Sequence, residues 1–215
     1  MMLNSNPRLA RFYRFFETYG AERLNGLDES YFVGLNEFDK EEAWNFLLQG
    51  ESLSEERING LYLLNDVRAV DLFKEILASP IKDSPYSAQR QFFEYQRLTL
   101  LGYVNNADPS TKNIVEMTKY SDSEFPKIRA KFAQVLPLRK IAPCAVDALK
   151  KMIFTEVERI PLAAAITKFM AIHGMDYEID DPVYNSIYMS LRSGGSEEKL
   201  SAMKRLEMIW KPDYL

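Results

Sequence analysis

Signals that begin and end helices recur through most of this chain, and they come in pairs. A capping side chain or a proline precedes an apolar run of helical spacing near Ser54, Ser84, Ser123 and Pro161. A polar joint or a proline separates each run from a second one, which indicates an antiparallel helical hairpin. The hairpins begin roughly 30–40 residues apart, a spacing typical of helical repeats. Because one hairpin cannot bury its apolar face alone, we expect an all-α fold of stacked hairpins with a shared core.

Further helix signals lie at the two ends of the chain. Asp39 opens a capping-box motif, with Asp39 as the cap, before the apolar run 43–48, and Ser196 precedes the last helical run, which stops at Pro212. No low-complexity segment or long linker divides the sequence. We therefore expect one domain over 1–215, with N-terminal capping helices in 1–52, hairpin repeats in 53–192 and a C-terminal capping helix in 193–215.

One stretch carries a recognisable repeat pattern. Between Arg57 and Phe73, an apolar helix is followed by the joint Asp66-Val67-Arg68-Ala69-Val70, in which Asp66 can cap a second apolar helix. This stretch resembles a HEAT-like repeat, and residues 128–133 and 162–166 resemble the beginnings of two others, although residues 138–143 depart from the family's joint. The resemblance extends from about Ser54 onward. It implies a HEAT-like α-solenoid of stacked antiparallel helical hairpins, with a concave face lined by the second helices, and it implies no single function.

The composition of the chain argues against several classes of protein. The net charge of −4 argues against a dedicated nucleic-acid binder, although it is compatible with a local basic groove. The single cysteine, Cys144, excludes an intrachain disulfide, and its apolar neighbours indicate a buried, inert thiol. Residues 1–7 lack the pattern of a signal peptide, and no apolar run approaches the ~18 residues of a membrane span. We therefore expect a cytoplasmic protein that does not contact a membrane.

The sequence offers little for metal or acid–base chemistry. With one histidine and one cysteine, and no EF-hand, GxGxxG or Walker pattern, we expect no metal, no cofactor and no catalytic residue. The acidic stretch 176–181 reads as a solvated loop that ends in the helix cap Asp181, with a weak cation site as the alternative. His173 precedes Gly174 at a predicted helix end, where its ring can donate a hydrogen bond to one of the last carbonyls.

Charge is distributed unevenly along the chain. Residues 28–56 hold nine acidic residues and one lysine, whereas residues 127–151 hold seven basic residues and one aspartate. One interpretation is that these charges occupy solvated helix faces and helix ends. The other is a bipolar surface that steers a partner toward the protein.

These observations favour a non-catalytic protein-binding module. Small stand-alone HEAT-like proteins are similar to bacterial immunity proteins, so the specific hypothesis is an immunity protein that neutralises a cognate, possibly secreted, toxin. The alternatives are a HEAT-like enzyme of the DNA glycosylase type, acting through the basic segment 127–151 with Asp147, and a lyase-type solenoid for a small ligand. Most aromatic residues have core spacing, but Tyr177, Tyr184 and Tyr188 are interface candidates. The predicted partner-binding residues lie on the second helices and comprise Asp71, Glu75, Glu116, Asp147, Lys151, Tyr184 and Tyr188.

Overall fold

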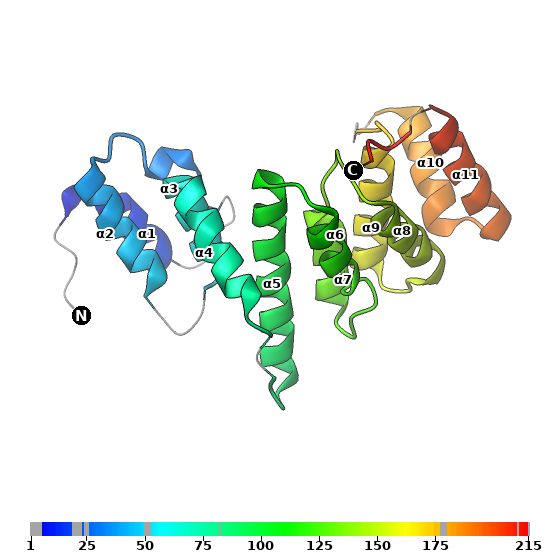
Figure 1. Ribbon diagram of the computed structural model, residues 1–215. Coiled ribbons are helices and arrows are strands. Elements are labelled where there is room, and N and C mark those ends of the chain that lie inside the picture. The colour runs from blue at the N-terminus through cyan, green and yellow to red at the C-terminus, as the bar shows by residue number, and fades with distance from the viewer. Residues whose placement is uncertain are drawn as a thin grey trace. The chain divides into compact units, whose positions relative to one another are not determined.

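The computed structural model of this chain is helical throughout (Figure 1). It describes residues 6–18, 23, 26–49, 53–81, 83–176, 180–209 and 211–214. Within these ranges the chain forms eleven α-helices and no strand, and an isolated β-bridge joins Ile141 to Tyr214. The all-α prediction is therefore confirmed.

The chain separates into two compact units, each with a core of its own. Unit 1 comprises Met1–Ser79 and unit 2 comprises Pro80–Leu215. The sequence predicted a single domain over 1–215, because no linker-like composition marks the junction. The boundary follows the end of a helix at Ala78, just before Pro80, where a proline ends helical hydrogen bonding without a change in composition.

Over its described ranges, unit 1 forms four α-helices, and two short 3-10 turns can be delimited. The helices are α1 (Ala10–Glu17), α2 (Glu37–Leu48), α3 (Glu55–Leu64) and α4 (Asp66–Ala78), and the turns are Pro7–Leu9 and Glu29–Tyr31. Helix α3 packs against both α2 and α4. The centre of the core is Phe12, whose ring lies 5.4–5.6 Å from four other aromatic rings, among them Phe32 and Phe46. Aromatic burial of this kind supplies most of the apolar area in so small a unit.

The helix caps of unit 1 agree with the sequence in one place and correct it in two. Ser54 caps α3 by accepting the backbone N–H of Arg57, as predicted. The predicted cap Asp39 is wrong, because Asn36 caps α2 and Asp39 is the third residue of that capping box. The cap of α4 is Asn65 rather than Asp66. In both places an asparagine shortly upstream offers the same acceptor oxygen, and the sequence alone does not rank the two.

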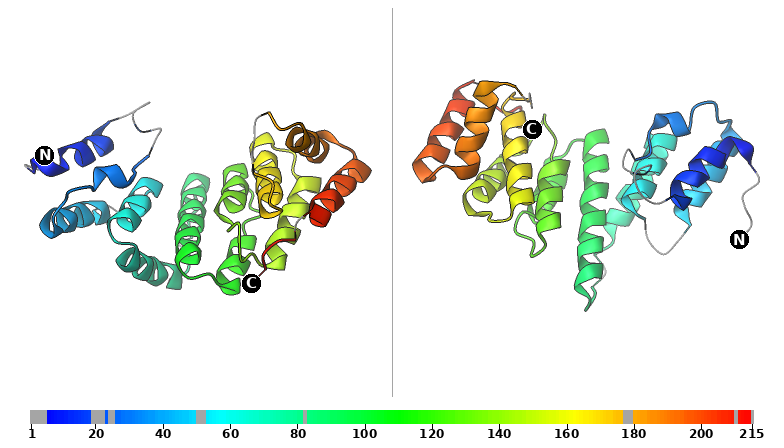
Figure 2. Two further views of the ribbon diagram at one scale, coloured as in Figure 1. Left: turned by 90° about the horizontal axis from the view of Figure 1, so that it is seen from above. Right: turned by 180° about the vertical axis from the view of Figure 1, so that it is seen from behind.

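The described residues of unit 2 form seven α-helices. Figure 2 shows this part of the chain in green, yellow, orange and red. They are α5 (Ser87–Ala107), α6 (Thr111–Thr118), α7 (Pro126–Val135), α8 (Pro143–Thr155), α9 (Arg159–Ile172), α10 (Pro182–Ser193) and α11 (Ser196–Ile209). Helix α7 packs against α5 on one side and α9 on the other, while α6 packs against α8. Helix α8 also contacts α9, and α10 contacts both α9 and α11. The helices α5, α7 and α9 thus form one row, and α6 and α8 a second row.

Local signals place most helix ends of unit 2. Pro126 and Pro143 occupy first helical positions, and Asp181 caps α10 through the N–H of Val183. Gly174 follows the end of α9 with φ at +72°, a conformation that favours glycine. The predicted start at Ser84 is early, because the Ser84 hydroxyl accepts the N–H of Tyr86 and the helix begins at Ser87.

Candidate functional site

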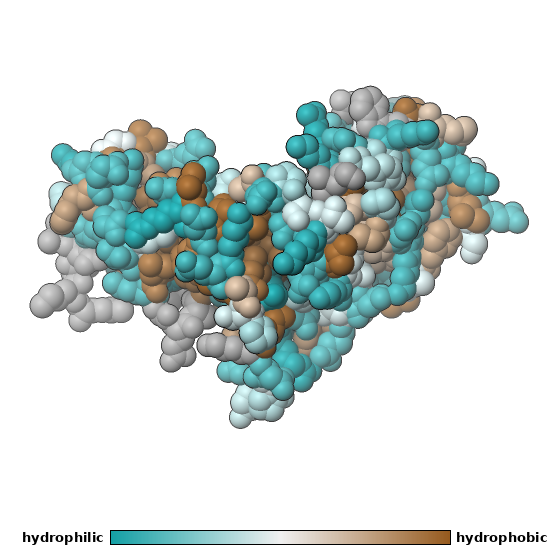
Figure 3. Space-filling view, viewed as in Figure 1, coloured by the Kyte–Doolittle hydropathy of each residue, from teal (hydrophilic) through white to brown (hydrophobic). Residues whose placement is uncertain are grey.

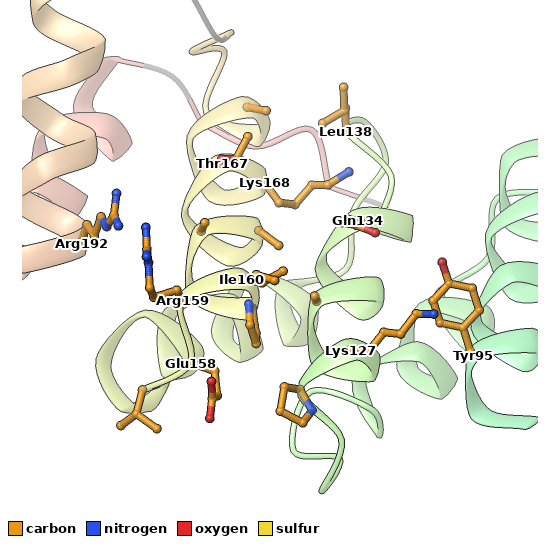
Figure 4. A pocket seen from close by; sticks show the side chains of 17 residues that line it. Tyr95, Lys127, Gln134, Leu138, Glu158, Arg159, Ile160, Thr167, Lys168 and Arg192 are labelled. Carbon is orange, nitrogen blue, oxygen red and sulfur yellow. The ribbon is translucent and has the colours of Figure 1, made fainter. Parts of the chain in front are cut away.

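An open hollow of about 1380 Å³ lies on unit 2 along α7 and α9 (Figure 4). Its floor comes from small side chains, Ala130 of α7 with Ala163 and Ala164 of α9. Because these positions lack long side chains, a bound chain can approach the two helices closely. Aliphatic side chains line the hollow as well, and two of them are strongly exposed: Val157 is 87% exposed and Ile160 is 72% exposed. Exposed aliphatic groups beside a hollow are typical of binding surfaces.

Basic side chains surround this apolar floor. Arg159 of α9 and Arg192 of α10 lie on one side of the hollow, and Lys127 of α7 lies on the other side (Figure 4). Lys168 of α9 completes the set, and Glu158 is the acidic residue among the lining side chains. The hollow therefore combines an apolar floor with an excess of positive charge, an arrangement that attracts an anionic, partly apolar ligand.

Tyr95 of α5 is the aromatic residue of the hollow, and two ammonium groups cover its ring. The Nζ atoms of Lys127 and Lys131 each lie 4.7 Å from the ring centroid, within the range of cation–π attraction. Lys131 is 7% exposed, so this contact accommodates a nearly buried charge. The ring is consequently engaged with cations of the protein itself.

Lys168 differs from the other cations because it is half-buried. Its ammonium donates a hydrogen bond to the carbonyl of Leu136, which follows the end of α7. Burial lowers the pKa of Lys168 to about 8, since a buried ammonium loses hydration. The charge of the hollow therefore decreases as the pH rises through this value.

A buried ion pair holds the loop between α8 and α9, which forms one wall of the hollow. The Arg129 guanidinium donates two hydrogen bonds to Glu156, from Nε at 2.6 Å and from Nη2 at 3.0 Å. The Glu156 carboxylate also accepts the N–H groups of Val157 and Glu158, at 3.0 and 2.9 Å. Its side chain is 4% exposed. Burial alone would raise the pKa of Glu156, but these hydrogen bonds outweigh burial and hold that pKa below its usual value.

A second hollow, of about 730 Å³, lies on unit 1 and contains two of the predicted partner-binding residues. Asp71 and Glu75 of α4 line it together with Trp44 and Arg68. The Arg68 guanidinium lies 4.1 Å from the Trp44 ring centroid and pairs with Glu41 at 2.6 Å. Figure 3 shows apolar side chains among hydrophilic ones on the face of unit 1 that it presents. The structure thus brings Asp71 and Glu75 to one exposed surface.

The other charged residues predicted to bind a partner lie apart from both hollows. Glu116 of α6 pairs with Lys119 at 2.6 Å and lies 3.7 Å from Arg97, so its charge is largely matched within unit 2. Lys151 of α8 pairs with Asp122. Asp147 is exposed on α8 and is not among the side chains that line the hollow of unit 2. The predicted residues lie on the helices expected to come second in each hairpin, whereas α7 and α9, which were expected to come first, form most of this hollow.

The predicted interface tyrosines have different environments. Tyr184 is 2% exposed, and its ring stacks on Tyr188 with centroids 6.2 Å apart. Core packing therefore accounts for Tyr184, while the half-buried Tyr188 retains some accessible surface. Tyr177 lies outside the described residues. Spacing of four along α10 places both rings on one face but does not distinguish an inward face from an outward one.

The acidic segment 28–56 serves mainly the structure of unit 1. Asp39 accepts hydrogen bonds from Asn6 at 2.8 Å and from Arg8 at 3.2 Å, and Glu42 accepts the hydroxyl of Tyr13 at 2.8 Å. Hydrogen bonds or ion pairs within the chain likewise engage Asp28, Glu37, Glu41 and Glu56. The interpretation as helix-end and structural charges therefore accounts for most of this segment.

The basic segment 127–151 is divided between structure and surface. Arg129, Lys150 and Lys151 form ion pairs with Glu156, Glu207 and Asp122. Lys127 is the member that lines the hollow, where residues distant in sequence, such as Arg159 and Arg192, join it. The basic group of the hollow could not be predicted from a run of charge in the sequence, because its members come from three helices. The apolar stretch that begins at Ile160 was the feature of the sequence that could have indicated this surface, since Ile160 remains exposed.

The single histidine and the single cysteine occupy positions that suit packing rather than metal binding. His173 is 2% exposed, and its Nδ1–H donates to the carbonyl of Phe169 at 2.7 Å, as expected for a residue at a helix end. Burial lowers the pKa of His173, so the neutral ring is favoured over the cation. Across the described ranges no three His, Cys, Asp or Glu side chains gather as a metal site. Cys144 is half-buried rather than fully buried.

The described helices include none that is long and apolar enough to cross a membrane. Comparison of the chain with protein-family models, with curated proteins and with solved structures found no match.

Proposed function

We propose that this protein is a non-catalytic protein-binding module with a HEAT-like α-solenoid architecture. The row formed by α5, α7 and α9, backed by α6 and α8, supports this architecture, because stacked antiparallel hairpins produce two such rows. The repeat-like stretch from Arg57 to Phe73 occupies α3 and α4, which pack together as a hairpin.

The hollow of unit 2 is the observation that carries the proposal. Pockets for small molecules measure about 300–1,000 Å³, whereas this hollow measures about 1380 Å³ and is open to solvent. Its exposed Val157 and Ile160 bury further apolar surface only when a ligand covers them. A segment of another protein fits these dimensions better than a small substrate does.

In its specific form, the proposal is a cytoplasmic immunity protein that binds and neutralises a cognate toxin. The small size of the chain and its charge of −4 suit an inhibitor that acts by occupying a surface of its target. On unit 1, Asp71 and Glu75 beside Trp44 offer a second, acidic contact surface for such a partner.

A nucleic-acid-directed enzyme is the second candidate. The four cations of the hollow, with Tyr95 and Glu158, favour it, because a glycosylase-type site combines a positive groove with an aromatic ring and a carboxylate. Two lysines already cover the Tyr95 ring, however, and exposed aliphatic groups are poor partners for a sugar–phosphate backbone. The protein-binding proposal accounts for both features.

Capture of a partner from the native cell lysate, at low and high salt and with mass spectrometry, tests this function. The substitution Ala164→Trp fills the floor of the hollow and should abolish capture, whereas Ala107→Trp, exposed on α5 outside the hollow, should leave capture unchanged. Circular dichroism verifies that both variants fold. Equal capture by the two variants would place the interface elsewhere. Recovery of nucleic acid alone, released at high salt, would favour the second candidate.

A further inference from the structure

Three exposed cations of the hollow in unit 2 have no carboxylate as an ion-pair partner in the part of the chain that the structure describes. No carboxylate of the described residues forms an ion pair with Lys127, Arg159 or Arg192, although all three are exposed. Several other cations of the same unit do have acidic partners: Arg90 pairs with Glu124 at 2.7 Å, and Lys150 pairs with Glu207 at 2.6 Å. The hollow therefore presents three exposed cations, against the single carboxylate of Glu158, whose charge a bound ligand can neutralise.

The positions of these cations indicate where a bound ligand would carry negative charge. Arg159 and Arg192 lie on the α9–α10 side of the hollow, and Lys127 lies on the α7 side, with Ile160 between them (Figure 4). The rest of the lining is mostly apolar and includes the small side chains of Ala130, Ala163 and Ala164. A ligand that satisfies both sides carries negative charge at its edges and apolar groups at its centre.

Nucleic acid satisfies this pattern less well than a polypeptide. Binding of single strands depends on stacking of bases on free aromatic faces, and Tyr95, the aromatic residue of the hollow, is engaged by Lys127 and Lys131. Val157 and Ile160 offer aliphatic surface, which suits Leu, Ile or Val side chains of a partner.

We propose that the hollow of unit 2 binds an acidic segment of the partner protein, in which aspartate or glutamate residues flank a short group of aliphatic side chains. This inference rests on the proposed function and specifies the chemistry of its partner. The carboxylates pair with Arg159 and Arg192 on one side and with Lys127 on the other, while the aliphatic side chains cover the alanine floor and contact Ile160. Because the paired charges lie at the exposed edge, affinity decreases with added salt.

The test uses the full-length protein and a random library of displayed 16-residue peptides. Selection should enrich peptides in which acidic residues flank aliphatic ones. Peptides synthesised from the enriched sequences should bind at least about tenfold more weakly to the double variant Arg159→Glu plus Arg192→Glu. A matched variant, Lys112→Glu plus Lys204→Glu, changes the net charge equally at exposed sites outside the hollow and should bind as the wild type does.

Other outcomes overturn the inference. Enrichment without an acidic preference, or acidic peptides that bind both variants equally, would show that the hollow does not select by charge. Binding of a labelled single-stranded or duplex oligonucleotide that only the hollow variant loses would assign the site to nucleic acid. Self-association in sedimentation experiments that only the hollow variant loses would assign it to a second copy of this chain.

The outcomes also separate this inference from the proposed function. A protein partner captured from the lysate through the hollow, together with no acidic preference in the library, would refute the acidic segment alone. Absence of any protein partner in the lysate experiment would refute the protein-binding function, whatever peptides the library yields.

Discussion

Removal of the Glu156 charge tests how the wall of the hollow is held. The variant Glu156→Gln keeps the shape of the side chain but leaves the Arg129 guanidinium, which is 16% exposed, without its carboxylate. Loss of one partner of a buried ion pair costs about 3–5 kcal/mol. Arg129 retains the carbonyl of Ser123 as an acceptor at 2.8 Å, and the amide oxygen of glutamine still accepts hydrogen bonds. We therefore expect a loss of about 2–3 kcal/mol in the free energy of unfolding.

Urea unfolding followed by circular dichroism measures this loss. The control is Glu158→Gln, which removes an exposed carboxylate two residues away and should change stability by less than about 0.5 kcal/mol. A cost below about 1 kcal/mol for Glu156→Gln would refute the role assigned to the ion pair. The same variant should also weaken capture of the partner, because Val157 and Arg159, which line the hollow, lie one and three residues after Glu156.

The pH dependence gives an independent check on the same group. The pKa of Glu156 is lower in the folded protein than its ordinary value of 4.5. The unfolded chain therefore takes up this proton first, so the stabilisation is fully present above about pH 4.5 and is lost as the pH falls through the folded pKa. The difference in stability between the wild type and Glu156→Gln should shrink over that range. A difference that stays constant down to pH 3 would contradict the assignment.

Three further predictions concern stability. Arg57→Met removes charged hydrogen bonds to three carbonyls at the end of α2 and should cost about 1–3 kcal/mol in urea unfolding; no loss would refute this capping role. Because the folded pKa of Lys168 is about 8, below its ordinary 10.5, wild-type stability should rise between pH 8 and 10 relative to Lys168→Met, as urea midpoints will report; parallel pH profiles would contradict this. Gly194→Ala places a Cβ atom against the carbonyl oxygen of Ser190 and should lower the melting temperature; an unchanged value would show that the backbone relaxes freely.

Local interactions explain why the helices were predictable. Ser54 caps α3, Pro126 begins α7 and Asp181 caps α10, and each acts through hydrogen bonds or dihedral preferences within a few residues. The errors in helix ends also span only a few residues: the cap of α2 is Asn36, three residues before the expected cap Asp39. Helix positions and the all-α class could therefore be derived from the sequence with shifts of a few residues.

Whether a charged or aromatic residue is paired, buried or exposed could not be predicted from the sequence, because it depends on the tertiary structure. Nine acidic residues in 28–56 suggested a patch, but the fold brings Asn6, Arg8 and Arg68 against several of them. Tyr184 has the spacing of an interface residue and is nonetheless buried. Neither outcome is encoded in a local pattern, because ion pairing and burial depend on which helix faces meet.

The sequence by itself thus determined the helices, to within a few residues of their ends, and the absence of any familiar catalytic motif, since those features depend on neighbouring residues. Only the tertiary structure decided where a ligand can bind. Lys127, Arg159 and Arg192 lie on three different helices, and they share one hollow because α7, α9 and α10 pack in succession. Helix packing, which follows from the burial of apolar faces over the whole unit, brings these charges together.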